Sequence, residues 1–154
     1  MTDMTSRPYA ADDYAACLAI FDSNVPKFLA PEERVEFQEF LGAVNADDNL
    51  YSVLIRDSAI VACGGLYIER TKRQASLSWG MVDRRLHRQK LGSALTEARL
   101  ALARSRPEVD VVTLATSQHT YPFYERFGFS VTKVTPDGFA KGLDCWDMSL
   151  RIGG

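Results

Sequence analysis

The sequence lacks the features that mark secreted and membrane proteins. Its three cysteines, Cys17, Cys63 and Cys145, are widely spaced and odd in number, so they predict neither a disulfide framework nor a metal site. No apolar run reaches the roughly 18 residues that a membrane span needs. Residues 1–4 do not resemble the start of a secretory signal. These absences predict a cytoplasmic protein with free thiols, no metal and no membrane partner.

A surplus of positive charge is also missing. The chain has 18 Lys and Arg against 20 Asp and Glu, which gives a formal net charge of −2. Because nucleic-acid binding needs a basic surface, this balance argues against a nucleic-acid partner. The chain has 154 residues, of which 46% are hydrophobic, and it shows no internal repeat. We therefore expect one domain, residues 1–154, with a sizeable core.

Periodicity predicts an alternation of strands and helices along the chain. Apolar and β-branched runs predict strands at 4–9, 51–56, 60–69, 75–82, 109–115, 129–134 and 145–152. Helices are expected to begin near Asp12 or Asp13, at Pro31, at Leu91 and at Thr120, and residues 135–143 are expected to form a long loop. The order β-α-α-β-β-β-α-β-α-β-β predicts an α/β domain with a mixed sheet of about six or seven strands and about four helices.

Three of the predicted helices show one apolar face each. Their apolar residues recur at helical spacing, and they are Tyr14, Cys17, Leu18 and Phe21 in the first helix, Phe37, Phe40, Leu41 and Val44 in the second, and Leu91, Leu95, Ala98 and Leu102 in the third. The connections carry turn signals as well. Asp57-Ser58 predicts a hairpin turn, and Gly128 predicts the end of the fourth helix.

The turn between the strand at 75–82 and the helix at 91 is unusually basic. It carries Arg84, Arg85, Arg88 and Lys90, with His87 among them, and Gly92 follows in the first turn of the helix. A helix N-terminus offers unpaired backbone N–H groups and the positive end of the helix dipole. The combination favours a phosphate or pyrophosphate group, and therefore a nucleotide-type cofactor.

Two segments, taken together with this element order, resemble a known family. The turn His87-Arg88-Gln89-Lys90-Leu91-Gly92 and the run Phe123-Tyr124-Glu125-Arg126-Phe127-Gly128-Phe129 resemble the GCN5-related N-acetyltransferase (GNAT) superfamily from about residue 7 to residue 151. In the preferred register, the family's first polar position falls on His87, its first glycine on Lys90 and its second on Gly92. A second register, from Gln89 to Ala94, fits the letters but lengthens the spacing from the strand.

The resemblance implies a GNAT-like fold in which two strands splay apart to form an acetyl-CoA cleft. The backbone of Met81 and Val82 would pair with the pantetheine arm as an added strand does. The turn and the start of the helix, His87, Arg88, Gln89, Lys90, Leu91, Gly92 and Ser93, would hold the pyrophosphate. Ser117 and Gln118 would contact the cofactor at the end of the strand at 109–115.

Tyr124 is the catalytic residue that the resemblance implies. The family's tyrosine at this position protonates the departing thiolate, and a phenol has a suitable pKa of about 10 for that step. Tyr121 is interpreted as a packing residue. No base is assigned, because the strand at 75–82 has no carboxylate, and Glu69, Asp22 and His119 remain candidates.

The expected activity is direct acetyl transfer from acetyl-CoA to a primary amine of a small molecule or peptide. Acids near the expected acceptor pocket favour a cationic amine, and Phe28 and Trp79 are candidate lining residues; the acids are Asp22, Glu32, Glu33, Glu36 and Asp47. Two alternatives stay open: a non-catalytic acyl-CoA-binding domain, and a protein that binds another nucleotide. The oligomeric state is also open, with a homodimer as one option.

Overall fold

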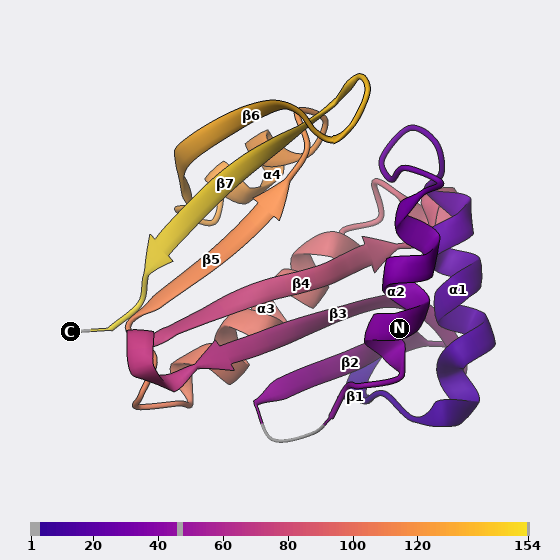
Figure 1. The fold of residues 1–154 in the computed structure, drawn as a ribbon. Coiled ribbons are helices and arrows are strands. Elements are labelled where there is room, and N and C mark those ends of the chain that lie inside the picture. The colour runs from indigo at the N-terminus through magenta and orange to yellow at the C-terminus, as the bar shows by residue number, and fades with distance from the viewer. Residues whose placement is uncertain (1–3, 46–47, 154) are drawn as a thin grey trace.

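The predicted order of elements is confirmed in a computed structural model, which describes residues 4–45 and 48–153 (Figure 1). The described residues form a seven-stranded sheet and four α-helices. The elements are β1 (Met4–Pro8), α1 (Tyr14–Ser23), α2 (Glu33–Leu41), β2 (Asn49–Arg56), β3 (Ala59–Glu69), β4 (Gln74–Val82), α3 (Leu91–Arg104), β5 (Val111–Thr116), α4 (Tyr121–Glu125), β6 (Ser130–Ala140) and β7 (Leu143–Arg151). Short 3₁₀ turns cover Ala11–Asp13, Arg70–Lys72 and Arg84–Leu86.

The sheet has the strand order β1-β2-β3-β4-β5-β7-β6. Neighbouring strands run antiparallel except β4 and β5, which run parallel. A parallel pair needs a crossover connection, and α3 supplies it. The mixed α/β sheet predicted from the element order is therefore confirmed.

Helices cover the two faces of the sheet unequally. In Figure 1, α1 and α2 lie in front of the half formed by β1 to β4, and α3 lies behind β3 and β4. The first core lies between α1, α2 and the sheet and includes Phe21, Phe37 and Tyr51. The second core lies on the α3 and α4 side and includes Val112 and Met148. Among the described elements, no helix covers the front face of β5 and β7.

The turn predictions at Asp57-Ser58 and Gly128 are confirmed by the backbone. Asp57 and Ser58 have φ of 52° and 68°, the left-handed pair that a two-residue hairpin needs. Gly128 has φ of 99° just after α4, as a helix-ending glycine does. The segment predicted to be a loop, residues 135–143, is a different case. Strand β6 continues to Ala140, so only Lys141 and Gly142 form a turn.

The end of β6 is predicted too early from the sequence because of Pro136 and Gly138. The β6–β7 register shifts between Thr135 and Ala140, and Asp137 has φ of 53°, so both residues lie in an irregular stretch of strand. β6 is an edge strand, where a missing N–H costs no ladder hydrogen bond. Proline and glycine therefore distort this strand without ending it.

The apolar face predicted for α3 is partly wrong. Leu91 and Leu95 are buried, but Ala98 and Leu102 are only half-buried. The helix instead turns Thr96, Arg99, Leu100 and Ala103 inward. Small and apolar residues occur nearly all around this helix, so the contact with β3 and β4 decides which face is inside. A buried arginine is the exception that the pattern did not predict.

Candidate functional site

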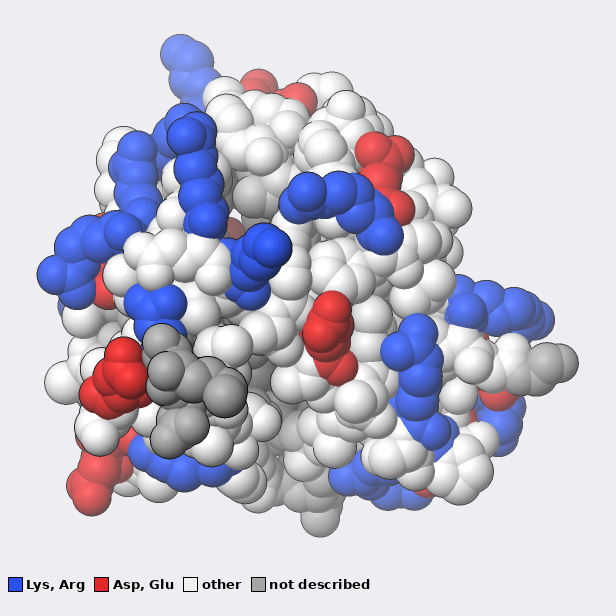
Figure 2. Space-filling view, turned by 180° about the vertical axis from the view of Figure 1, so that it is seen from behind, with Lys and Arg blue, Asp and Glu red and all other residues white. Residues whose placement is uncertain are grey.

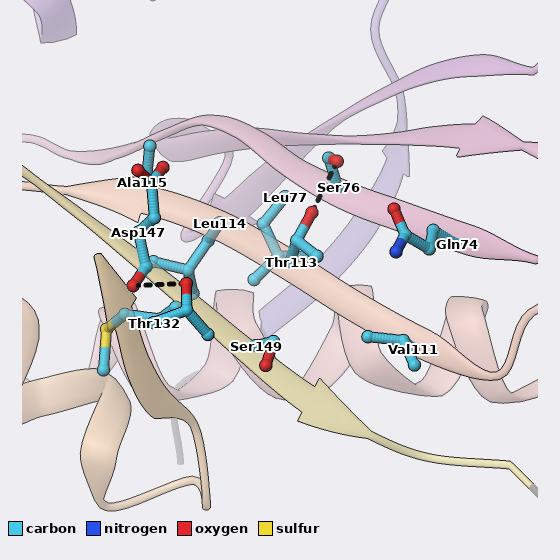
Figure 3. A pocket seen from close by; sticks show the side chains of 11 residues that line it. Gln74, Ser76, Leu77, Val111, Thr113, Leu114, Ala115, Thr132, Asp147 and Ser149 are labelled. Carbon is cyan, nitrogen blue, oxygen red and sulfur yellow. Dashed lines mark hydrogen bonds between the residues drawn. The ribbon is translucent and has the colours of Figure 1, made fainter. Parts of the chain in front are cut away.

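The site begins where β4 and β5 separate. The two strands pair at Gln74↔Val111, Ala75↔Val112 and Ser76↔Thr113, and no later pairing is found within the described residues. The hydroxyls of Ser76 and Thr113 are joined at 2.7 Å across the last pair (Figure 3). We call the region beyond this pair, between 77–82 on β4 and 114–116 on β5, the β4–β5 opening.

A bulge in β4 accompanies this separation. Leu77 packs into the core on the α3 side, whereas Trp79 packs against the core under α1 and α2. Residues an even number apart on a regular strand share a face, so one extra residue has inverted the alternation. Trp79 has φ of 44°, and its carbonyl accepts a hydrogen bond of 2.8 Å from the buried Tyr51 hydroxyl. Trp79 is therefore a core residue, and the bulge is held from the front face.

The bulge also decides which backbone groups face the opening. Met81 is the register partner of Cys63 in β3, and the Asp83 N–H donates to the Val61 carbonyl at 3.0 Å. Because alternate residues in a strand direct their N–H and C=O groups to opposite sides, Val82 turns these groups away from β3. The Val82 carbonyl is already bonded, to Asn24 Nδ2 at 3.0 Å and His87 Nε2 at 3.1 Å. The Val82 N–H is thus better placed than Met81 to meet a ligand in the opening.

The backbone of the basic turn is left-handed at two positions, one residue apart. Arg88 and Lys90 have φ of 72° and 64°, whereas Gln89 and Leu91 are not left-handed. Alternation of this kind makes a concavity of N–H groups, called a nest, that suits an anion. Lys90 is also the N-cap of α3, a helix of 14 residues whose dipole adds to the attraction. The left-handed Lys90 favours the register in which it replaces the family's first glycine.

The side chains around this turn have different partners. Arg85 pairs with Asp83 at 2.7 Å, and the bonds from Arg85 hold the pKa of the Asp83 carboxyl below its usual range. Arg84 lies over the ring of Phe28, 5.6 Å from its centroid. The side chains of Arg88 and Lys90 are exposed. Figure 2 shows several Lys and Arg side chains at the upper left of the face seen from behind, and others scattered over the rest of that face.

The two segments that carry the family resemblance are in contact. A Cβ atom at Gly92 would lie 3.4 Å from Cζ of Phe123, so the start of α3 packs against α4. Tyr124, the next residue, is half-buried, with its ring 5.0 Å from that of Phe123 and 6.0 Å from that of Phe129. Its hydroxyl makes no hydrogen bond to any described residue. Phe123 thus links Tyr124, the predicted acid, to the start of α3 at the predicted phosphate turn. The Tyr124 hydroxyl is free to donate its proton to a ligand.

Tyr121 is stacked on Trp146, with ring centroids 3.9 Å apart, which agrees with its interpretation as a packing residue. Ser117 is buried, and its Oγ accepts a hydrogen bond from the His119 N–H. The amide of Gln118 bonds to the β6–β7 turn through both of its ends, with Gly142 O at 2.8 Å and Asp144 N at 2.8 Å. Gln118 thus fastens that turn to the end of β5, and its contact with a cofactor stays a prediction.

The candidate bases lie in separate places. Glu69 is the register partner of Gln74, at the opposite end of β4 from the opening, and pairs with Lys72 at 3.4 Å. Asp22 is bonded to Arg34 at 2.9 Å. The ring of His119 lies 5.9 Å from that of Phe28. Asp47 is outside the described residues.

One cavity borders the opening, and a second lies between the loop after α1 and the β6–β7 turn. The first, of about 570 Å³, lies on the helix-free face at the point where β4 and β5 separate (Figure 3). Its polar side chains are Gln74, Ser76, Thr113, Thr132, Asp147 and Ser149. Asp147 is a carboxylate that the sequence reading missed, because only the β5–β7 register places it beside Ala115. The second cavity, of about 350 Å³, is lined by Lys27, Glu32, His119 and Lys141 among others.

Cysteine and potential metal ligands are dispersed among the described residues. Within residues 4–45 and 48–153, no group of three or more His, Cys, Asp and Glu could hold a metal ion. The three cysteines are free, and a hydrogen bond to Cys63 together with burial raises the pKa of the Cys17 thiol far above its usual range. None of the described helices is long and apolar enough to cross a membrane.

Comparison with known families and structures agrees with this architecture. A family model described as the acetyltransferase (GNAT) domain matches residues 23–152. The chain therefore belongs to the GNAT acetyltransferase family, which makes it an acyltransferase of the N-acetyltransferase kind. The family uses acetyl-CoA. No curated protein sequence matches the chain.

Solved structures share the fold at low sequence identity. The ribosomal-protein-S18-alanine N-acetyltransferase from Escherichia coli is 21% identical, with a TM-score of 0.78 over 99% of this chain and 96% of that chain. A ribosomal-protein-alanine N-acetyltransferase from Brucella melitensis is 20% identical, with a TM-score of 0.79 over 96% and 99%. An aminoglycoside 6'-N-acetyltransferase complexed with coenzyme A is 14% identical, with a TM-score of 0.73 over 96% of both chains. The predicted GNAT-like fold is confirmed.

Proposed function

We propose that the chain transfers an acetyl group directly from acetyl-CoA to a primary amine of a small molecule or peptide. The observation that carries the proposal is the β4–β5 opening, which has the nest of Arg88 and Lys90 at its end and Tyr124 nearby. The same fold and the three free cysteines suit the cytoplasmic location expected from the sequence.

The residues at the opening fit coenzyme A. The N–H groups from Arg88 to Ser93, at the start of α3, would hold the pyrophosphate, and the left-handed Arg88 and Lys90 shape that concavity. An exposed charge–dipole contact contributes only about 0.3–1 kcal/mol, so several must act together. The N–H of Val82 and the backbone of Gly80 would receive the pantetheine arm, as an edge strand receives an added strand.

The chemistry needs a positioned amine and a proton for the leaving group. The amine nitrogen forms a bond to the acetyl carbon, the carbon–sulfur bond breaks, and its electron pair goes to sulfur. The Tyr124 hydroxyl then gives its proton to that sulfur, and the amine loses one proton to water or to a base not yet assigned. N–H groups at the bulge and at Val82 favour negative charge on the carbonyl oxygen.

The acceptor is best matched by a cationic amine that carries polar groups. The first cavity offers the Asp147 carboxylate, and hydroxyl groups that include those of Thr113 and Ser149. A carboxylate in a cavity attracts an ammonium group, and neighbouring hydroxyls can donate to or accept from a polar acceptor. We therefore assign the helix-free face of β5 and β7 to the acceptor.

A binding assay followed by a turnover assay tests the proposal. CoA and acetyl-CoA should raise the melting temperature by mass action, whereas ATP and NAD should not. Release of free thiol from acetyl-CoA should then depend on an added amine. Binding of CoA without turnover on a broad amine panel would favour the non-catalytic alternative. Binding of ATP or NAD in place of CoA would reject the proposal.

A further inference from the structure

A buried arginine lies beneath the β4 bulge. Arg99, in the third turn of α3, is only 3% exposed, and no acid in the described part of the chain pairs with it. Its Nε is buried without a partner, and its one hydrogen bond is long, from Nη1 to the Gly65 carbonyl at 3.5 Å. Burial of an unpaired charge is costly, so this position is hard to explain by stability alone.

The strands above Arg99 leave room for its guanidinium. A Cβ atom at Gly80 would lie 2.6 Å from Nη2, and one at Gly64 would lie 3.1 Å from Cζ. Both distances are too short for ordinary contacts, so any larger residue on β3 or β4 at these positions would displace the side chain. Two glycines on neighbouring strands therefore make a space that the guanidinium fills.

This space adjoins the β4–β5 opening. Gly80 follows the bulged Trp79 and its backbone is exposed, although the guanidinium behind it is not. Tyr51 bonds the Trp79 carbonyl from the front face, while Arg99 lies against Gly80 from the α3 side. The backbone that would receive the thioester is thus held from both faces of the sheet, with a fixed cation behind it.

We infer that Arg99 is a positioning residue for acetyl transfer. Its guanidinium lies behind Gly80, which has no side chain, and from there it stabilises negative charge on the coenzyme A sulfur and the acetyl carbonyl oxygen. The inference rests on the proposed function. A cation near a thiol favours the thiolate and lowers the thiol pKa, and the effect is strong where water is excluded. The reaction leaves an electron pair on sulfur, so the same field lowers its barrier.

The test measures the thiol pKa of bound CoA through the ultraviolet absorbance of the thiolate. Arg99→Met keeps the apolar stem and removes the charge, whereas Arg99→Lys keeps a charge. Arg104→Met is the matched control, because Arg104 is exposed at the end of the same helix. We expect Arg99→Met to raise the thiol pKa by about one unit and lower kcat about tenfold, with Arg99→Lys intermediate and Arg104→Met unchanged.

Urea unfolding separates this role from a structural one. If Arg99 acts through its charge, Arg99→Met should be as stable as the parent or more so, because an unpaired buried charge is gone. A thiol pKa and kcat equal to those of the parent in Arg99→Met would overturn the inference alone. If that variant does not fold, an unchanged thiol pKa in Arg99→Gln overturns it. Failure of the parent to bind CoA would instead overturn the proposed function and the inference with it.

Discussion

The two halves of the sheet on either side of the β4–β5 opening are packed differently. The first half, β1 to β4, has α1 and α2 on one face and α3 on the other, and rings such as Phe37 and Tyr51 are fully buried there. The second half, β5 to β7, has helices on one face only, and many of its residues are half-exposed. The parallel pairing that joins the halves spans only three residue pairs.

This difference assigns different tasks to the two halves. In the proposed function, the well-packed half would contribute backbone groups at the bulge and at Val82, where Tyr51 bonds the Trp79 carbonyl and Arg99 lies behind Gly80. The lightly packed half would contribute side chains, with Tyr124 for the cofactor and Asp147 in the open cavity for the acceptor. A cofactor common to a family suits the rigid half, and an acceptor that varies within the family suits the adaptable half.

The largest effect should come from Tyr124→Phe. The substitution removes the proposed acid and keeps the ring, so kcat should fall by about 10²–10⁴-fold while CoA affinity stays close to that of the parent. Thiol release and calorimetric titration with CoA would measure the two quantities. Tyr121→Phe, on the same helix, should have nearly full activity. Equal turnover in the two variants would mean that the second half does not supply the acid.

Removal of an aromatic ring should lower the free energy of unfolding more in the first half than in the second. Phe37→Ala removes a fully buried ring from the first core and should lower the free energy of unfolding by about 3–5 kcal/mol. Tyr121→Ala removes a half-buried ring stacked on Trp146 and should cost about 1–2 kcal/mol. Urea unfolding at one pH would compare them. A larger loss for Tyr121→Ala would contradict the comparison.

One acid-dependent contribution to stability is expected in the first half, at Asp13. Bonds from Arg7 hold the pKa of the Asp13 carboxyl below its usual range. This contribution is full above the unfolded pKa of about 4 and is lost as the pH falls through the lowered folded value. Asp13→Asn should therefore lose about 1 kcal/mol at pH 7, since Arg7 is partly exposed and screened, and little at pH 2. Equal losses at both pH values would exclude the ion pair as the cause.

The smallest effect is expected at the nest. Lys90→Gly should raise the free energy of unfolding by about 0.5 kcal/mol, because relief of the left-handed strain is partly offset by the greater freedom of glycine in the unfolded chain. Lys90→Ala keeps a Cβ atom and should show no gain. If CoA binding weakens equally in both variants, the lysine charge contributes to it; if neither changes, only the backbone does.

The sequence by itself determined the order of the elements and the family, and it predicted the phosphate turn. These features depend on local periodicity, turn residues and short motifs, which residues within one segment carry. Gly128 ended its helix and Asp57-Ser58 made its hairpin for the same local reason.

The tertiary structure decided the rest, because it depends on which segments meet. The bulge in β4 moved Trp79 into the first core and turned Val82, not Met81, toward the opening. The β5–β7 register placed Asp147 in the cavity, and the glycines of two strands received Arg99 where a helical pattern predicted no charge. No local signal specifies such contacts, since each one joins residues distant in sequence through packing.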